Sequence, residues 1–191
     1  RLDLRGYPFF RAQTSATIPW FELAGAVSRY LETEGVAVTF PEIVAQIKSP
    51  DVVRIVSDIL GAGAISATEY AEALLAREQS RTSYVACLRE VGADALLFPT
   101  VPIPACSIGA ETVAVGSAPL GIFAASTRHT EPGSNAGVPG ITVPAGLTQD
   151  GLPVGLALDG APHSDQRILR IGKEMERVLC AATFPRLDAH V

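Results

Sequence analysis

The 191-residue sequence predicts an α/β fold, in which helices are interleaved with short buried strands. Apolar residues recur at helical spacing through much of residues 22–92, and short continuous apolar runs typical of buried strands follow. Because 48% of the residues are apolar and 18% are charged, the chain is expected to fold rather than to stay disordered. We predict one α/β unit over residues 1–191, mainly helical over 1–92, with strands and a final helix over 93–191.

Three helices are predicted before residue 61. Residues 22–34 carry apolar side chains at helical spacing, and the pattern stops before Gly35. Two further helices are expected over 41–47 and 50–60, because each begins at a proline, which fits the first turn of a helix.

A capping box predicts the start of the longest helix. In the sequence Ser66-Ala67-Thr68-Glu69, the Ser hydroxyl and the Glu carboxylate can each accept a hydrogen bond from a free backbone N–H group. Apolar residues continue at helical spacing as far as Val91, and Gly92 is a residue at which helices commonly end.

Strands and one more helix are predicted for the second half. The apolar run 95–98 indicates a buried strand that enters a proline-rich loop. Further strands are expected over 141–144 and 154–158, joined through a turn at Asp150-Gly151. A last helix is expected from Ser164, as its cap, to about Cys180, with an inward face made of Ile168, Ile171, Met175 and Val178.

The composition excludes several classes of partner. A formal net charge of −5 provides no basic surface for nucleic acid. The longest apolar stretch, 113–125, is interrupted by glycine and proline and is not expected to span a membrane. The low charge does suggest that part of the surface packs against more protein.

The cysteines indicate neither disulfides nor a metal site. Cys87, Cys106 and Cys180 are odd in number, widely spaced and without a CxxC pattern. A reducing, cytoplasmic location is therefore expected, with no metal and no cofactor.

Three motifs of the second half carry a family resemblance: DALLFPTVPIPA at 94–105, NAGVPGITVPAGL at 135–147 and GLPVGLAL at 151–158. In this order and spacing they closely resemble the closing portion of the amidase signature family, and the resemblance extends over roughly residues 50–180. It implies part of the amidase signature fold, a mixed β-sheet flanked by helices. The sequence around Ser49 to Val52 and around Thr130 looks most like the mandelamide and indoleacetamide hydrolases of that family.

The resemblance implies a serine hydrolase that cleaves the C–N bond of primary amides. In the family one serine attacks the carbonyl carbon, while a second serine, in a cis peptide, and a neutral lysine transfer protons. The two serines lie in a Gly-Ser-Ser-Gly stretch, and this sequence contains no Ser-Ser pair. Its two lysines, Lys48 and Lys173, stand outside any such setting. We expect the C-terminal portion of a longer amidase, with no catalytic residue of its own, that is inactive alone.

The resemblance also implies which residues would line the substrate pocket. The segment before Asn135 borders the pocket in the family, and the matching positions are Ile122 and Phe123, facing the acyl group, with Thr130 and Asn135 supporting the loop. The alternatives are that Ile122 and Phe123 are core residues and that Asn135 belongs to a turn at Gly137. A separate Ser–His site is not favoured, although His129, His163 and His190 lie near Ser126, Ser134 and Ser164 in sequence.

Two alternatives for the whole chain remain open. One is a non-catalytic homologue that serves as an interaction or regulatory subunit. The other is a fragment of the catalytic chain of an amidotransferase, its A subunit, which usually carries an aspartate at the position of Thr127. Under the leading interpretation, a portion of a larger sheet has an open edge and apolar helix faces, so a homodimer or swapped assembly is expected.

Overall fold

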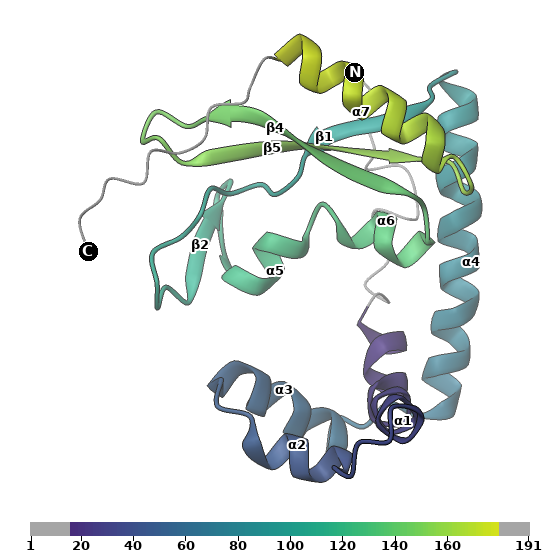
Figure 1. Cartoon of the computed structure of the whole chain (residues 1–191), viewed down its shortest axis with the longest axis vertical. Coiled ribbons are helices and arrows are strands. Elements are labelled where there is room, and N and C mark those ends of the chain that lie inside the picture. The colour runs from purple at the N-terminus through teal and green to yellow at the C-terminus, as the bar shows by residue number, and fades with distance from the viewer. Residues whose placement is uncertain (1–15, 180–191) are drawn as a thin grey trace. The chain divides into compact units, whose positions relative to one another are not determined.

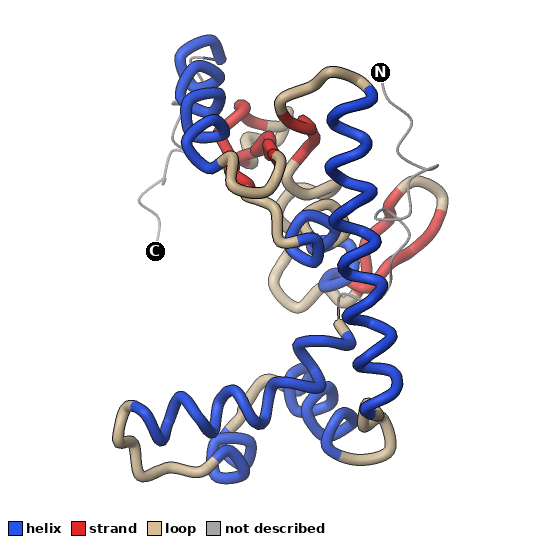
Figure 2. The backbone as a smooth tube through the Cα atoms, turned by 90° about the vertical axis from the view of Figure 1, so that its right-hand side faces the viewer, coloured by secondary structure: helices blue, strands red, loops and turns tan. Residues whose placement is uncertain are grey.

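The computed structural model describes residues 16–179 (Figure 1). These residues fall into two compact units, one within Ala12–Glu78 and one within Gln79–Val191. The helix α4 (Ala67–Glu90) is the only element that contributes to both units among the described residues. It is drawn as one uninterrupted helix in Figure 2.

The first unit is entirely helical over its described part. It contains α1 (Thr17–Thr33), α2 (Phe40–Gln46), α3 (Pro50–Leu60) and the first part of α4. The three predicted helices are confirmed, although α1 begins five residues before the predicted start at Glu22. A capping box that the sequence analysis overlooked starts α2, where the Glu42 carboxylate accepts the Thr39 backbone N–H at 2.7 Å.

The predicted capping box at the start of α4 is present. The Ser66 N–H donates to Glu69 Oε2 at 2.8 Å, and the Glu69 N–H donates to Ser66 Oγ at 3.2 Å. The Ser66 hydroxyl and backbone N–H together hold the pKa of Glu69 below its usual value. One turn after Ser66, Tyr70 stacks on Phe21 with ring centroids 4.1 Å apart, which packs α1 against the first part of α4.

The second unit is built on a three-stranded sheet. Its strands are β1 (Ala95–Pro99), β4 (Gly140–Leu147) and β5 (Pro153–Gly160), in the order β1-β5-β4, and both pairs are antiparallel. The hairpin between β4 and β5 turns at Gly151, whose φ of 80° is the left-handed conformation that glycine adopts without strain. The predicted α/β class, strands and turn are confirmed.

Helix α7 (Asp165–Leu179) covers one face of this sheet (Figure 1). A Cβ atom at Gly172 would lie 3.0 Å from Ile141 Cδ1, so the glycine allows α7 to approach β4 closely. Ile168 is buried as predicted, but Val178 is 70% exposed, so its predicted inward position is wrong. At 100° per residue, Val178 lies about 80° around the helix from Ile168 and falls outside the packed stripe.

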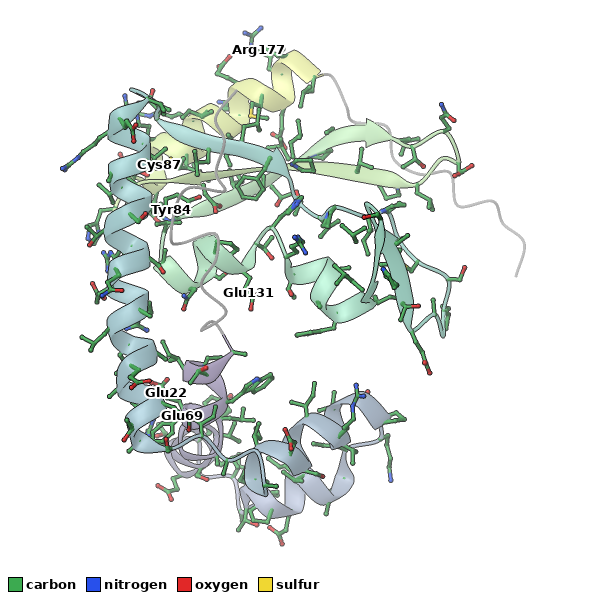
Figure 3. All side chains as sticks on the ribbon, turned by 180° about the vertical axis from the view of Figure 1, so that it is seen from behind. Glu22, Glu69, Tyr84, Cys87, Glu131 and Arg177 are labelled. Atoms are coloured by element: carbon green, nitrogen blue, oxygen red, sulfur yellow. The ribbon has the colours of Figure 1, made fainter. Side chains whose placement is uncertain are left out.

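On the opposite side of the sheet lie elements that the sequence analysis did not assign. They are the hairpin of β2 (Thr112–Val115) and β3 (Ala118–Gly121) and the short helices α5 (Ile122–Thr127) and α6 (Glu131–Ala136). The second part of α4, which the sequence predicted, packs on the same side through Tyr84, Cys87 and Leu88. The main core of this unit lies between α4, β1 and the end of α6, and consists of Tyr84, Cys87, Leu88, Leu96 and Ala136. Figure 3 shows Tyr84 and Cys87 on the side of α4 that faces the sheet.

A carboxylate is buried at the edge of this core. Asp159 of β5 is 8% exposed, and the Tyr84 hydroxyl donates to its Oδ2 at 3.0 Å. A Cβ atom at Gly140 would lie 2.6 Å from Asp159 Oδ1, and one at Gly133 of α6 would overlap Oδ2. Burial raises the pKa of Asp159, and the hydrogen bond from Tyr84 offsets this only in part. The carboxylate therefore occupies space that two glycines leave free.

We predict that Gly133→Ala destabilises the protein. Helix propensity alone would favour alanine in α6 by about 1 kcal/mol. The added methyl group would collide with the Asp159 carboxylate, and relieving such overpacking costs about 1–3 kcal/mol. The net result expected in urea unfolding monitored by circular dichroism is a lower midpoint.

The control for this prediction is Gly121→Ala. Gly121 has a φ of −59° and open space where a Cβ would stand, so its substitution should leave the midpoint unchanged. A Gly133→Ala variant as stable as the Gly121→Ala variant would contradict the packing described for Asp159.

Candidate substrate-side site

The two apolar candidates lie at the start of α5. Phe123 is 68% exposed and Ile122 is half-buried, so Phe123 is not a core residue of the described unit. The Ile122 backbone N–H donates to the Glu111 carbonyl at 3.1 Å, which attaches the start of α5 to the residue before β2. An aromatic ring is thereby presented on the surface by an anchored backbone.

A series of threonine hydrogen bonds connects α5 to α6. Thr127 Oγ1 donates to the Phe123 carbonyl at 3.1 Å, and Thr130 Oγ1 donates to the Thr127 carbonyl at 3.2 Å. The Ser134 N–H then donates to the Thr130 carbonyl at 3.1 Å. Thr130 is therefore joined to the α5 backbone through Thr127. Each hydroxyl binds the carbonyl of a residue three or four positions earlier, which is a local pattern that the sequence analysis did not use.

Asn135 lies in the last turn of α6, four residues after Glu131, where the helix begins. Gly137 ends the helix in the left-handed conformation, with a φ of 64°. Asn135 is therefore helical, and the turn that the sequence suggested follows it. Its side chain is half-buried and makes no hydrogen bond to the described residues.

His129 adds a contact that the sequence analysis did not anticipate. Its Nδ1 lies 2.8 Å from the carbonyl oxygen of Pro99, and its ring meets the edge of Phe98 with centroids 6.2 Å apart. Because a carbonyl oxygen only accepts hydrogen bonds, Nδ1 carries the proton and Nε2 is an acceptor in the neutral ring. This bond holds the segment between α5 and α6 against the end of β1.

The structure gives no support for a separate Ser–His nucleophile among the described residues. Ser164 stands just before α7, as predicted, and its carbonyl accepts the Ile168 N–H at 3.0 Å, while its Oγ donates to the Ala161 carbonyl at 2.6 Å. Its hydrogen is already engaged with the backbone of the preceding turn. His190 and Cys180 lie outside the described residues. Lys48 and Lys173 are exposed, and Lys173 lies within α7.

Other kinds of site find no support in the described part of the chain. Residues 16–179 contain no group of three or more His, Cys, Asp or Glu side chains that could hold a metal ion. No helix in that range is long and apolar enough to cross a membrane. A shallow concave surface on α3 is lined only by residues of that helix and the turn after it, namely Arg54, Ile55, Ser57, Asp58 and Ala62.

Comparison with known proteins supplies the family. The model of the Amidase family matches residues 7–169. The chain is 36% identical to the indoleacetamide hydrolase of Agrobacterium vitis over 90% of its length and 37% of the relative's, and 36% identical to the mandelamide hydrolase of Pseudomonas putida over 86% and 34%. It is also 35% identical to the A subunit of the glutamyl-tRNA(Gln) amidotransferase from Desulfotalea psychrophila, over 53% of this chain and 19% of that relative.

A solved amidase has the same fold. Its crystal structure superposes with a TM-score of 0.69 and 31% identity, covering 92% of this chain and 36% of the amidase chain. These matches cover most of this chain but only about a third of the length of each relative. The three motifs, the α/β fold and the family match over most of the sequence lead to one conclusion, that this chain belongs to the amidase signature family.

Proposed function

We propose that this chain forms the acyl-group side of the substrate site in an amidase that hydrolyses uncharged aromatic or aliphatic primary amides to the acid and ammonia. The observation that carries the proposal is the exposed ring of Phe123, held on α5 beside Ile122. Small-molecule sites are lined mainly by apolar and aromatic side chains with a few placed polar groups. The amides named for two relatives, indoleacetamide and mandelamide, both carry an aromatic acyl group.

Each candidate residue has a role in this proposal. Ile122 and Phe123 contact the acyl group, and Thr130 and Asn135 hold the polar side of the same segment. Thr130 fits this role because its hydroxyl fixes the segment between the two helices. Asn135 fits it because its amide is half-buried at the end of α6 and offers both a donor and an acceptor.

The contact of Thr127 favours an uncharged substrate over an amidotransferase role. In the amidotransferase interpretation this position would carry a carboxylate to hold an amino group. Here the Thr127 hydroxyl donates to the Phe123 carbonyl, so it stabilises α5 and carries no charge. The match to the amidotransferase chain covers half of this chain, whereas the matches to the two hydrolases cover most of it.

The nucleophile of the proposed amidase is not among these 191 residues. A serine, a cis serine and a lysine are proposed to act from a portion that carries the Gly-Ser-Ser-Gly stretch, because the present sequence has no Ser-Ser pair. The runner-up is a non-catalytic homologue that serves in interaction or regulation. Reading the gene upstream of Arg1 separates the two, since an open frame that encodes the serine pair supports the amidase.

We predict that the purified 191-residue chain does not hydrolyse aromatic or aliphatic primary amides and does not react with serine-directed phosphonates. The physical reason is that an unactivated serine hydroxyl is a poor nucleophile at neutral pH. Ammonia release and intact mass measure the two reactions. Turnover that persists through repurification and is lost in Ser126→Ala or Ser134→Ala would overturn this prediction.

In a longer amidase that contains these residues, Ile122→Ala and Phe123→Ala should change the preference among acyl groups by about 1–3 kcal/mol in kcat/KM, the range for reshaping an apolar pocket. Val178→Ala is the control, because Val178 is an exposed apolar residue of α7, on the other face of the sheet. An equal loss for every amide, together with a loss of folding, would show that the α5 pair is structural.

We also propose that the chain assembles as a homodimer or swapped dimer through the apolar surface of its sheet unit. Leu97 of β1 is 57% exposed and Leu169 of α7 is 60% exposed. Sedimentation over a dilution series should show a dimer, with an interface of about 2,000 Å² in total. Leu97→Asp should weaken the dimer, and Asp94→Asn should not. A monomer at micromolar concentration that binds no hydrophobic dye would contradict the proposal.

A further inference from the structure

The Asp159 carboxylate is the meeting point of three elements, one of which, α6, carries Asn135. Asn135 belongs to the proposed substrate-side site, which consists of Ile122, Phe123, Thr130 and Asn135. Asp159 belongs to β5, it accepts the Tyr84 hydroxyl of α4, and it fills the space above Gly133 of α6. Gly133 lies two residues before Asn135 in the same helix. The position of α6 is therefore determined in part by what stands at residue 159.

Filling the space above Gly133 with a carboxyl group is unfavourable in free energy compared with filling it with an apolar side chain. Burying a polar group costs free energy unless hydrogen bonds replace its water, and Tyr84 is the partner that the described residues supply to Asp159. An apolar side chain could fill the volume at lower cost, but it could not be oriented by Tyr84. Hydrogen bonding fixes direction, whereas apolar contact does not.

We propose that Asp159 is a positioning residue, which is held by Tyr84 and in turn fixes the place of α6 and of Asn135 at the substrate-side site. The role of Asn135 rests on the proposed function, while the placement of α6 does not. Asp159 does not touch the substrate in this proposal. It acts only through the helix that packs against its carboxylate.

The ionisation of Asp159 gives the proposal a signature that ordinary core packing lacks. Among the titratable groups of the elements around the carboxylate, Tyr84 of α4 contacts it, Cys87 lies in the same core cluster as Tyr84, and Glu131 stands in the first turn of α6. Strands β1 and β4 contain none. Burial raises the pKa of Asp159 above its ordinary value of 3.8, and opening of α6 to water would restore that value.

The pH dependence of α6 closure follows from the difference in the Asp159 pKa between the closed and the open state of α6. The closed state binds the proton more tightly than the open state, so closure is most favourable below the ordinary carboxyl pKa. It weakens as the pH rises from about 4 through the raised pKa of the closed state, and it is constant above that. Inside this window the opening equilibrium can change by up to about tenfold per pH unit.

Hydrogen exchange of the α6 amides tests the hydrogen bond. Tyr84→Phe removes the donor and keeps the ring, and it should accelerate exchange on the order of tenfold at the bonded amides of Ser134, Gly137 and Val138 relative to the β4–β5 ladder. Tyr70→Phe is the matched control, because Tyr70 also lies on α4 and also donates to a carboxylate, that of Glu22. It should leave the α6 amides unchanged.

Asp159→Asn tests the ionisation. The amide oxygen can still accept from Tyr84, so α6 should stay protected, but the fall in its protection factors from about pH 4 upward should disappear. Asp94→Asn is the control, since Asp94 is an exposed carboxylate paired with Arg167 at 3.0 Å. It should keep the wild-type pH profile.

The outcomes separate this proposal from a general core role and from the proposed function. Equal acceleration of all amides in Tyr84→Phe, or an unchanged pH profile in Asp159→Asn, would overturn it. If Tyr84→Phe does not fold, the pH profile of Asp159→Asn decides alone. All of these readouts are made on the 191-residue chain without substrate, so a failure of the amidase proposal would not alter them.

Discussion

The hydrogen bond between Tyr84 and Asp159 is the constraint on which the arrangement of the sheet unit depends. It crosses 75 residues of sequence and joins α4 to β5, the central strand of the sheet. Two neighbouring elements make room for the Asp159 carboxylate. Helix α6 does so through Gly133, and β4 does so through Gly140 at its first position. The position of α6, and with it that of Asn135, therefore depends on a hydrogen bond between two residues outside that helix.

The main elements of the fold were predictable because long elements leave periodic patterns. The start of α4 followed from Ser66 and Glu69 alone, and the β4–β5 hairpin followed from two apolar runs around Gly151. The segment 112–136 was not predictable in this way, because its strands and helices are four to six residues long. One turn of helix is too short to show a period. Val178 was predicted to face inward from the apolar spacing of α7, but it is exposed. The part of α7 that packs on the sheet is narrower than the apolar stripe in the sequence.

The candidate site was located by resemblance and not by physical pattern. Nothing in the residues Ile122 and Phe123 alone distinguishes a pocket wall from a core, and only the structure shows that the Phe123 ring is exposed. The polar framework behind it, in which Thr127, Thr130 and His129 bind backbone carbonyls, combines local and distant partners. The local bonds have a spacing that a reader of the sequence can find. The contact of His129 with Pro99 spans 30 residues and depends on the fold.

The missing side chains at Gly133 and Gly140 have a consequence for how this sequence can diverge. Three positions that are far apart in the chain share one small volume, so they do not vary independently. While residue 159 carries a carboxylate, an alanine at either glycine is expected to cost stability. If residue 159 first changed from aspartate to a small residue, alanine could then be accommodated at Gly133 or Gly140. Each such alanine would make a later return of aspartate at residue 159 unfavourable. The order of substitutions, and not only their identity, would decide how stable the descendants are.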